Sequence, residues 1–187
     1  MHNLNNKWTL WLHLPHDTDW TINSYKKVST FETLEDCIIL IENINKQIVE
    51  KCMLFIMKNN IKPIWEDSEN TKGGCLSYKI NTDYVYEVWK KLNYYLIGGS
   101  LINDNDNDND NDIMNNINGI SISPKKNFCI IKFWIKNTEN LKKNNIYNEI
   151  NLEPKTVENE KKDPFKIDIL CNIEKQNCIF KQHEILY

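Results

Sequence analysis

One stretch of the chain combines a large aromatic side chain with two adjacent carboxylates. It reads Ile61-Lys62-Pro63-Ile64-Trp65-Glu66-Asp67 and is followed shortly by Lys72-Gly73-Gly74. Because proline and paired glycines interrupt helices and strands, the stretch is expected to form a loop. An indole stacks on a nucleic-acid base, and a carboxylate accepts hydrogen bonds from the N1–H and N2–H₂ groups of guanine. A core tryptophan followed by a solvated turn has the same residue types, so the stretch alone leaves both interpretations open.

Two other tryptophans, Trp20 and Trp134, also lie in or beside expected loops, whereas Trp8, Trp11 and Trp89 fit core periodicity. If the Trp20 and Trp65 loops meet at one rim of a sheet, two indoles could sandwich a single ring. Such a sandwich favours an electron-poor or cationic base by about 1–3 kcal/mol per face. Lys125 and Lys126, in an expected hairpin turn, could contact a phosphate chain.

The composition predicts one globular domain over residues 1–187, with a hydrophobic content of 41%. The net charge of −3 offers no global basic field for duplex DNA or an anionic membrane. All 23 basic residues are lysine, so phosphate would meet flexible point charges and no bidentate arginine forks.

The six cysteines form no C-x-x-C pair and have no histidine at ligand spacing, which argues against a zinc site. There is no signal-peptide pattern and no apolar run near ~18 residues, so we expect a soluble intracellular protein with reduced thiols. Residues 103–112 alternate Asn and Asp, and a disordered insertion is expected at about 103–116. A calcium site is the alternative there, but the glycine and terminal glutamate of an EF-hand are missing.

Hydrophobic periodicity predicts more strands than helices. Helices are expected from the N-cap Thr33 through Ile38, Ile41, Ile44 and Ile48, over Tyr84–Leu96, and over the polar segment Thr138–Leu152, which a charged linker, Glu153–Asp163, follows. Strands are expected at Trp8–Leu14, with Trp8, Leu10, Leu12 and Leu14 on one face, near Tyr25–Phe31, at Cys52–Met57 with Cys75–Ile80 as its partner, in a hairpin of Ile117–Ser123 and Phe128–Ile135, and at Phe165–Ile173 and Cys178–Phe180. This order indicates an α+β fold, with an antiparallel sheet and helices on one face.

Taken together, the ordered motifs resemble the eukaryotic translation initiation factor 4E family, which binds the 7-methylguanosine cap of messenger RNA. The resemblance is carried by His2-x-Leu4-x-Asn6-Lys7-Trp8-Thr9-Leu10-Trp11, Asp19-Trp20, Thr30-Phe31-x-Thr33-Leu34-Glu35-Asp36, Ile61-x-Pro63-Ile64-Trp65-Glu66-Asp67, Lys72-Gly73-Gly74, Leu96-Ile97-Gly98, Asn118-Gly119 and Ile131-x-Phe133-Trp134. It covers most of the chain to about residue 136, plus the late strand Phe165–Ile173. It implies a curved antiparallel sheet with about three helices on its convex face and a cap pocket formed by loops at the concave side.

The resemblance also implies roles for the matching residues. Trp20 and Trp65 would stack on the two faces of the methylated guanine, while Glu66 would bind its N1 and N2 groups. Trp134 would lie near the N7-methyl group, and Lys125, with Lys126 adjacent, would contact phosphate. The set contains no nucleophile and implies no cofactor or metal, so the implied activity is binding of capped mRNA without turnover.

Some positions depart from the family pattern. Cys75-Leu76 stands where the family commonly has Arg-Trp, and Asn127 and Ile130 replace basic residues, which predicts a weaker grip on the triphosphate unless Lys126 or Lys132 compensates. The groove for a 4G-like scaffold or a 4E-binding regulatory protein would involve His2, Leu34 and Ile38, but Ile38 replaces a tryptophan and Lys90 an apolar residue. A plain core role for Ile38 is the alternative.

The resemblance implies a monomeric, cytoplasmic initiation factor, with the nucleus left open as a second location. The substitutions favour as its rival a cap-binding repressor that engages no 4G-type scaffold. An enzyme acting on nucleotides would need metal-binding acids at helical spacing or a P-loop, and the sequence has neither. A further alternative is an interaction scaffold in which all the tryptophans are core residues.

Overall fold

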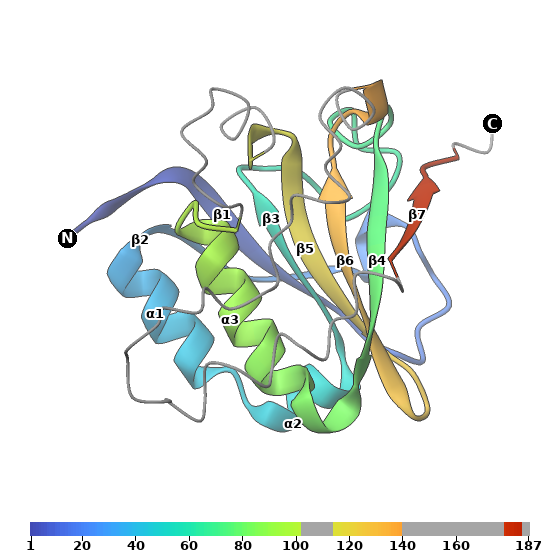
Figure 1. Ribbon diagram of the computed structural model, residues 1–187, viewed down its shortest axis with the longest axis horizontal. Coiled ribbons are helices and arrows are strands. Elements are labelled where there is room, and N and C mark those ends of the chain that lie inside the picture. Colours follow the sequence, from blue (N-terminus) through green and yellow to red (C-terminus); the bar gives the residue numbers. More distant parts are fainter. Residues whose placement is uncertain (102–113, 140–177, 185–187) are drawn as a thin grey trace, which may run out of the picture.

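The computed structural model describes residues 1–101, 114–139 and 178–184. Its strands form one curved, seven-stranded antiparallel sheet in the order β2-β1-β3-β5-β6-β4-β7 (Figure 1). The strands are β1 (Asn3–His13), β2 (Lys26–Thr33), β3 (Met53–Lys58), β4 (Gly74–Asn81), β5 (Ile117–Pro124), β6 (Phe128–Ile135) and β7 (Ile179–Gln182). The helices α1 (Leu34–Asn43), α2 (Lys46–Lys51) and α3 (Val85–Ile97) all cover the same face of the sheet (Figure 1). The predicted α+β class is confirmed.

Side-chain caps mark the starts of the helices α1 and α2. Thr33 caps α1 by accepting a 3.2 Å hydrogen bond from the backbone N–H of Asp36, as predicted. The expected continuation through Ile48 is wrong, because α1 ends at Asn43 and Asn45 caps the separate helix α2 through the N–H of Gln47. Short 3₁₀ turns at Ile22–Ser24 and Thr82–Tyr84 precede β2 and α3.

Alternation along the strands creates two apolar layers. Side chains such as Trp8, Leu10 and Ile56 pack under the helices in the main core. A smaller cluster on the opposite, concave face contains Phe55, Met57, Ile61, Cys75 and Trp134, with Trp11 and Trp65 packed against it. Leu14, expected on the core face of the first strand, is 42% exposed because β1 ends at His13.

The predicted pairing of the Cys75–Ile80 strand with Cys52–Met57 is wrong. β4 pairs with β6 and β7, whereas β3 pairs with β1 and β5. The chain between β3 and β4 therefore passes over β5 and β6 on the concave face of the sheet. Its last residue, Gly73, packs closely against β6. A Cβ atom on Gly73 would lie 1.7 Å from the carbonyl oxygen of Ile135, so only glycine allows this approach.

Several predicted segments lie outside the described residues. They are the helix Thr138–Leu152 beyond Glu139, the linker Glu153–Asp163, the strand Phe165–Ile173 and the Asn/Asp insertion up to residue 113. At the described end of that insertion, the carbonyl oxygen of Met114 accepts a 2.6 Å hydrogen bond from the buried Lys58, and Asn116 is 3% exposed. The predicted late strand at Cys178–Phe180 corresponds to β7.

Candidate functional site

The loop between β3 and β4, which contains Trp65 and Glu66, is held by its own polar side chains. Asp67 accepts 3.0 Å hydrogen bonds from the backbone N–H groups of Lys62 and Glu69. Its carboxylate therefore faces the loop backbone and is not available to a ligand. Of the two adjacent carboxylates, Glu66 is exposed, whereas Asp67 is half-buried and holds the loop backbone.

Asn70 forms the centre of the same loop and is fully buried. Its amide group donates to the carbonyl oxygens of Lys62 and Ile64 at 2.9 and 2.8 Å. Its side-chain oxygen accepts a 2.9 Å hydrogen bond from Asn118 on β5. These contacts hold the backbone on the N-terminal side of Trp65 against the sheet. The position of the Trp65 backbone relative to β5 is therefore fixed.

Trp20 projects from the loop after β1 and is 55% exposed. Its indole stacks on the imidazole of His13, with ring centroids 4.5 Å apart and an interplanar angle of 5°. His13 is itself fully buried, and its Nε2 atom lies 2.9 Å from the carbonyl oxygen of Asp19. The histidine therefore fixes both the indole and the backbone just before it.

These two loops and the concave ends of β3, β5 and β6 enclose a cavity of about 320 Å³. It is lined by Trp20, Tyr25, Met53, Phe55, Pro63, Ile64, Trp65, Glu66, Ser121, Ser123, Lys125, Lys132 and Trp134. This volume lies within the range typical of small-molecule sites. Of the residues expected to bind the base or the phosphates, Trp20, Trp65, Glu66, Trp134 and Lys125 lie together here.

Two sequence expectations about this site need adjustment. Lys126 does not line the cavity and is exposed at the tip of the β5–β6 hairpin, while Lys132 of β6 lies in the wall. Trp134, expected in or beside a loop, lies within β6 and is 4% exposed, with its Nε1–H donating a 3.0 Å hydrogen bond to Ser121. Its indole is thus fixed in the floor.

The charged groups of the cavity are one carboxylate, from Glu66, and two ammonium groups, from Lys125 and Lys132. Burial raises the pKa of Tyr25 to about 12, and the negative charges of Glu66 and Asp19 add to the rise. Tyr25 is therefore a neutral phenol at neutral pH. A ligand that donates hydrogen bonds at one end and carries negative charge at the other matches this charge distribution.

His183, which follows β7, supports the site from behind and was missed by the sequence reasoning. It is 5% exposed and stacks on Trp65, with centroids 5.3 Å apart and an interplanar angle of 17°. It also contacts Trp134 at a centroid distance of 5.2 Å. The ammonium group of Lys181, two residues earlier, lies 5.1 Å from the centre of the Trp65 ring.

The hydrogen bonds of His183 define its protonation. Its Nδ1 lies 2.7 Å from the carbonyl oxygen of Asn70, which can only accept, so Nδ1 carries the proton. Burial lowers the pKa of His183 below the ordinary value of 6.5, which keeps the ring neutral. Its Nε2 then accepts from the thiol of Cys75, 3.2 Å away, and burial raises the pKa of that thiol to about 12.

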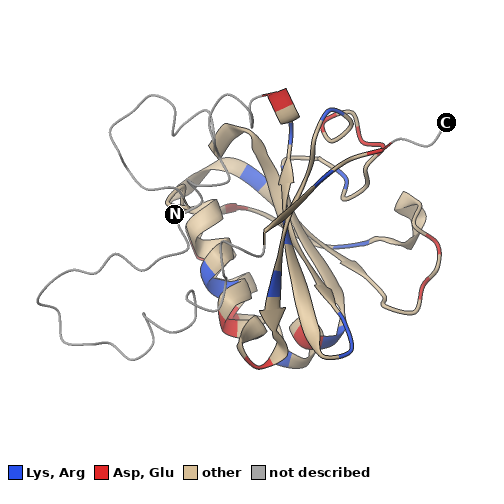
Figure 2. Cartoon of the chain, turned by 45° about the vertical axis from the view of Figure 1, so that its right-hand side comes forward, with Lys and Arg blue, Asp and Glu red and all other residues tan. Residues whose placement is uncertain are grey.

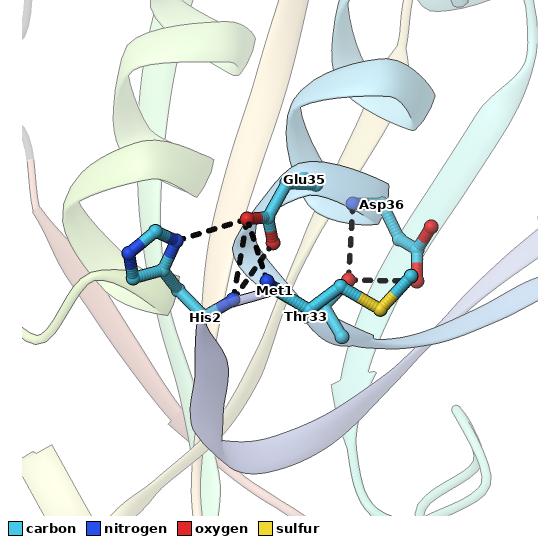
Figure 3. A network of polar contacts seen from close by, with 5 residues as sticks. All are labelled: Met1, His2, Thr33, Glu35 and Asp36. Carbon is cyan, nitrogen blue, oxygen red and sulfur yellow. Dashed lines mark hydrogen bonds and ion pairs between the residues drawn. The ribbon is translucent and has the colours of Figure 1, made fainter.

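The expected partner-groove residues lie on the helix-covered side of the sheet. The backbone N–H of His2 donates to Glu35 at 3.0 Å, and its Nδ1 lies 2.9 Å from the same carboxylate (Figure 3). These hydrogen bonds lower the pKa of Glu35 to about 2. The carbonyl oxygen of His2 accepts a 2.8 Å hydrogen bond from the N–H of Leu34. Leu34 and Ile38 are 40% and 43% exposed, so the alternative of a core role for Ile38 is wrong.

Next to this apolar surface, a polar bridge joins α1 to α3. The carboxylate of Glu42 accepts from Lys90 and, at 2.7 Å, from the hydroxyl of Tyr94. Lys90 is thus paired, at a position where the sequence comparison expected an apolar groove residue. The exposed surface of α1 is therefore apolar at Leu34 and Ile38 and polar where Glu42 contacts Lys90 and Tyr94 of α3.

Among residues 1–101, 114–139 and 178–184, no group of three or more His, Cys, Asp or Glu side chains could hold a metal ion. No helix in the described part of the chain is long and apolar enough to cross a membrane.

Known proteins match the chain over most of its length. The family model for eukaryotic initiation factor 4E matches residues 3–178. Initiation factor 4E of Saccharomyces cerevisiae is 28% identical over 145 residues, which are 74% of this chain and 63% of the relative. The initiation factor 4E homologue of Acanthamoeba polyphaga mimivirus is 26% identical over 141 residues, covering 64% of this chain and 50% of the relative. The chain thus spans less than two thirds of the length of these two relatives.

Solved structures share the fold. The complex of C. elegans eIF4E-3 with the 4E-binding protein Mextli and cap analog matches with a TM-score of 0.65 at 23% identity, covering 78% of this chain and 79% of that chain. Ascaris suum eIF4E-3 with m7G cap matches with a TM-score of 0.62 at 24% identity, covering 78% of this chain and 81% of that chain. The family model extends over nearly the whole chain and the folds agree, so this chain belongs to the eukaryotic initiation factor 4E family.

Proposed function

We propose that the protein binds the 7-methylguanosine cap of mRNA in the concave-face cavity and brings capped mRNA to translation initiation in the cytoplasm. The observation that carries the proposal is the meeting of Trp20, Trp65 and Glu66, from two separate loops, in one cavity with Lys125. Cap complexes of C. elegans and Ascaris suum eIF4E-3 share the fold, which supports this use of the cavity.

In the proposed complex the base enters between the indoles of Trp20 and Trp65. Methylation at N7 makes guanine cationic, and a cation on an indole face gains more than a neutral ring does. Glu66 accepts hydrogen bonds from the guanine N1–H and N2–H₂, which adenine cannot offer in the same arrangement. Lys125 and Lys132 then meet the triphosphate as point charges, without the bidentate geometry of arginine.

The proposed activity is binding without turnover. Two stacked faces at about 1–3 kcal/mol each, together with charge-assisted hydrogen bonds, account for selection of a methylated cap. The histidines behind the two tryptophans limit how far the indoles move when the base enters, so little of this energy is lost in ordering the site.

Retention on immobilised 7-methyl-GTP tests the proposal. The wild-type protein is expected to bind the resin and to elute with free 7-methyl-GTP but not with the same concentration of GTP. Trp65→Ala is expected to pass through the column, because one complete stacking face is lost. Trp89→Phe, a core variant remote from the cavity, is the matched control for loss of an indole; retention that survives Trp65→Ala but not Trp89→Phe would contradict the proposed site.

A second candidate role shares the cap site but differs in the partner: a cap-binding repressor that engages no 4G-type scaffold. The observation that favours it is the Glu42–Lys90–Tyr94 bridge, which places polar groups beside the exposed Ile38. Co-purification from cells separates the roles. A 4G-like scaffold retained together with the protein on the cap resin supports initiation, whereas cap-bound protein without that scaffold supports repression.

A further inference from the structure

The concave face of the sheet continues past the cavity as a basic strip. Strand alternation places Ser77 and Lys79 of β4 on the same face as Cys75, while Leu76, Tyr78 and Ile80 point into the core under the helices. We use the name basic strip for the following side chains of that face on β4, β6 and β7: Lys79, Phe128, Ile130, Lys132, Ile179 and Lys181.

The strand register makes these residues neighbours. Lys79 lies opposite Ile130, Ser77 lies opposite both Lys132 and Ile179, and Cys75 lies opposite Lys181. Residues two apart on a strand are separated by about 7 Å, so the strip extends from the cavity wall toward the far end of β4 in steps of that size. Ile179 is 69% exposed, and Lys79 and Lys181 are also exposed.

The strip is positively charged although the whole chain carries a net charge of −3. None of the concave-face residues of β4, β6 and β7 is acidic. Among the described residues, none of the lysines of the basic strip joins an ion pair. Figure 2 shows basic residues on strands of the sheet as well as at the β5–β6 tip. The ammonium group of Lys79 lies 4.7 Å from the centre of the Phe128 ring, which pairs a cation with an aromatic face.

The strip is continuous with the proposed cap site. Lys132 belongs to both, and Lys181 lies over the ring of Trp65. A triphosphate that leaves the base pocket past Lys125 and Lys132 would therefore deliver the next nucleotides onto Lys79 and its apolar neighbours. Lysines spaced along a groove with aromatic and aliphatic surface between them are the pattern by which proteins hold single-stranded nucleic acid without reading its sequence.

We propose that the basic strip binds the first ribonucleotides of the message after the cap, through lysine–phosphate contacts and base contacts with Phe128 and Ile179. The inference rests on the proposed cap site and deepens it, because it assigns a second ligand segment to a surface outside the cavity. It predicts a protein that binds a capped RNA more tightly than the cap alone.

The test compares 7-methyl-GTP with a capped RNA of about eight unstructured nucleotides and with the same RNA uncapped. The wild-type protein is expected to bind the capped RNA at least about fivefold more tightly than 7-methyl-GTP at low salt. Lys79→Ala should lower the affinity for capped RNA by about threefold more than it lowers that for 7-methyl-GTP. It should also reduce the salt dependence of capped-RNA binding by about 0.7 in log K per log salt.

Charge reversal and a matched control sharpen the result. Lys79→Glu should remove the advantage of the capped RNA altogether, and Ile179→Ser should reduce it without changing the salt slope. Lys27→Ala, an exposed lysine of β2 at the other edge of the sheet, is the control and should leave the advantage intact.

The outcomes separate this inference from the proposed function. If 7-methyl-GTP does not bind, the proposed function fails and the inference fails with it. If 7-methyl-GTP binds but the capped RNA binds no more tightly, the inference alone is overturned. Equal losses of capped-RNA affinity in Lys79→Ala and Lys27→Ala would also overturn the inference, because they would show only a non-specific attraction of RNA to lysine.

Discussion

At the scale of single residues, the proposed selectivity for guanine depends on Glu66. Its carboxylate is the acid that lines the cavity, since Asp67 is engaged by the loop backbone. A carboxylate that accepts two N–H groups of a base in a partly closed site contributes more than a neutral acceptor does. Its removal also leaves those two donors of the base without a partner.

We expect Glu66→Gln to weaken 7-methyl-GTP binding by about 1.5–3 kcal/mol, because the neutral amide replaces a charged acceptor and turns a donor toward the base. Stacking should persist, so binding becomes weaker but still quenches tryptophan fluorescence. The measurement is a fluorescence titration, with Glu32→Gln on β2 as the control. An unchanged dissociation constant for Glu66→Gln would remove Glu66 from the site.

The supporting residues show which parts of the site are visible in the sequence. Trp20, Trp65 and Glu66 lie in loops that the sequence predicts, so their residue types and their neighbours were enough to identify them as candidate binding residues. The hydrogen bond between His183 and Asn70 spans 113 positions of the chain, and nothing near His183 in the sequence marks its role. A lone histidine after a short strand gives no signal until the fold places it against Trp65.

His183 makes stability depend on pH. Its pKa in the folded protein is below 6.5, so between that value and 6.5 the unfolded chain binds more protons than the folded one. The contribution of the neutral His183 to the free energy of unfolding is therefore fully present above about pH 6.5, and it is lost as the pH falls below that value. Cys75, Lys132 and Glu66 are the ionisable groups that act on it, and of these Lys132 lowers and Glu66 raises its pKa.

We expect the melting temperature of the wild-type protein to fall between about pH 7 and about pH 5 and this fall to be smaller in His183→Gln. The exposed His16 supplies the control, since His16→Gln should keep the wild-type profile. Thermal unfolding followed by circular dichroism measures the effect. Parallel profiles for wild type and His183→Gln would show that His183 is not the group responsible.

At the scale of elements, the loop between β3 and β4 acts as a preformed support for Trp65. Asn70 holds two of its carbonyl oxygens, and Asn118 holds Asn70 in turn. Glu69 adds an ion pair with Lys136 at 2.7 Å, just beyond β6. The loop is therefore tied to β5 and to the end of β6.

We expect Asn70→Ala to lower the free energy of unfolding by about 2–4 kcal/mol, because it leaves buried carbonyl and amide groups without partners. It should also weaken 7-methyl-GTP binding, since Trp65 loses its support. Urea unfolding and cap titration measure the two effects. Ser68→Ala, on the exposed side of the same loop, should change neither; equal effects of both variants would contradict the central role of Asn70.

Local signals predicted the elements better than their pairing. The β5–β6 hairpin follows from two apolar runs around Pro124 and Asn127, and α1 follows from the cap at Thr33. The partner of β3 could not be inferred in this way, because β5 and β6 enter the sheet between β3 and β4 from a later part of the chain. Pairing with the next strand along the chain is a reasonable expectation that long-range packing overrides here.

At the scale of the whole molecule, the sheet separates two surfaces. The cavity and the basic strip lie on the concave face, whereas Leu34 and Ile38 lie on α1, in the helical layer (Figure 1). Groups on opposite faces of a packed sheet have no shared contacts, so changes on one face are expected to add to changes on the other. We therefore expect that a cap in the cavity and a partner protein on α1 do not compete for the same residues.

We expect Ile38→Asp to reduce capture of a 4E-binding protein, because it places a charge in the exposed apolar surface of α1, while it changes cap affinity by less than about twofold. Lys90→Leu is expected to increase capture of a partner that docks through an apolar helix face, because it removes the polar bridge to Glu42 and adds an apolar side chain. Pull-down from cell extract on cap resin measures both. A joint loss of cap and partner binding in Ile38→Asp would show that the two faces are coupled.

The most direct measurement of the central claim is a titration of the wild-type protein with 7-methyl-GTP and with GTP, followed by tryptophan fluorescence. The cap-binding account predicts saturable quenching by 7-methyl-GTP, with GTP binding weaker by at least about tenfold, because only the methylated base carries the charge that the two indoles favour. No quenching by 7-methyl-GTP, or equal affinity for the two nucleotides, would contradict it.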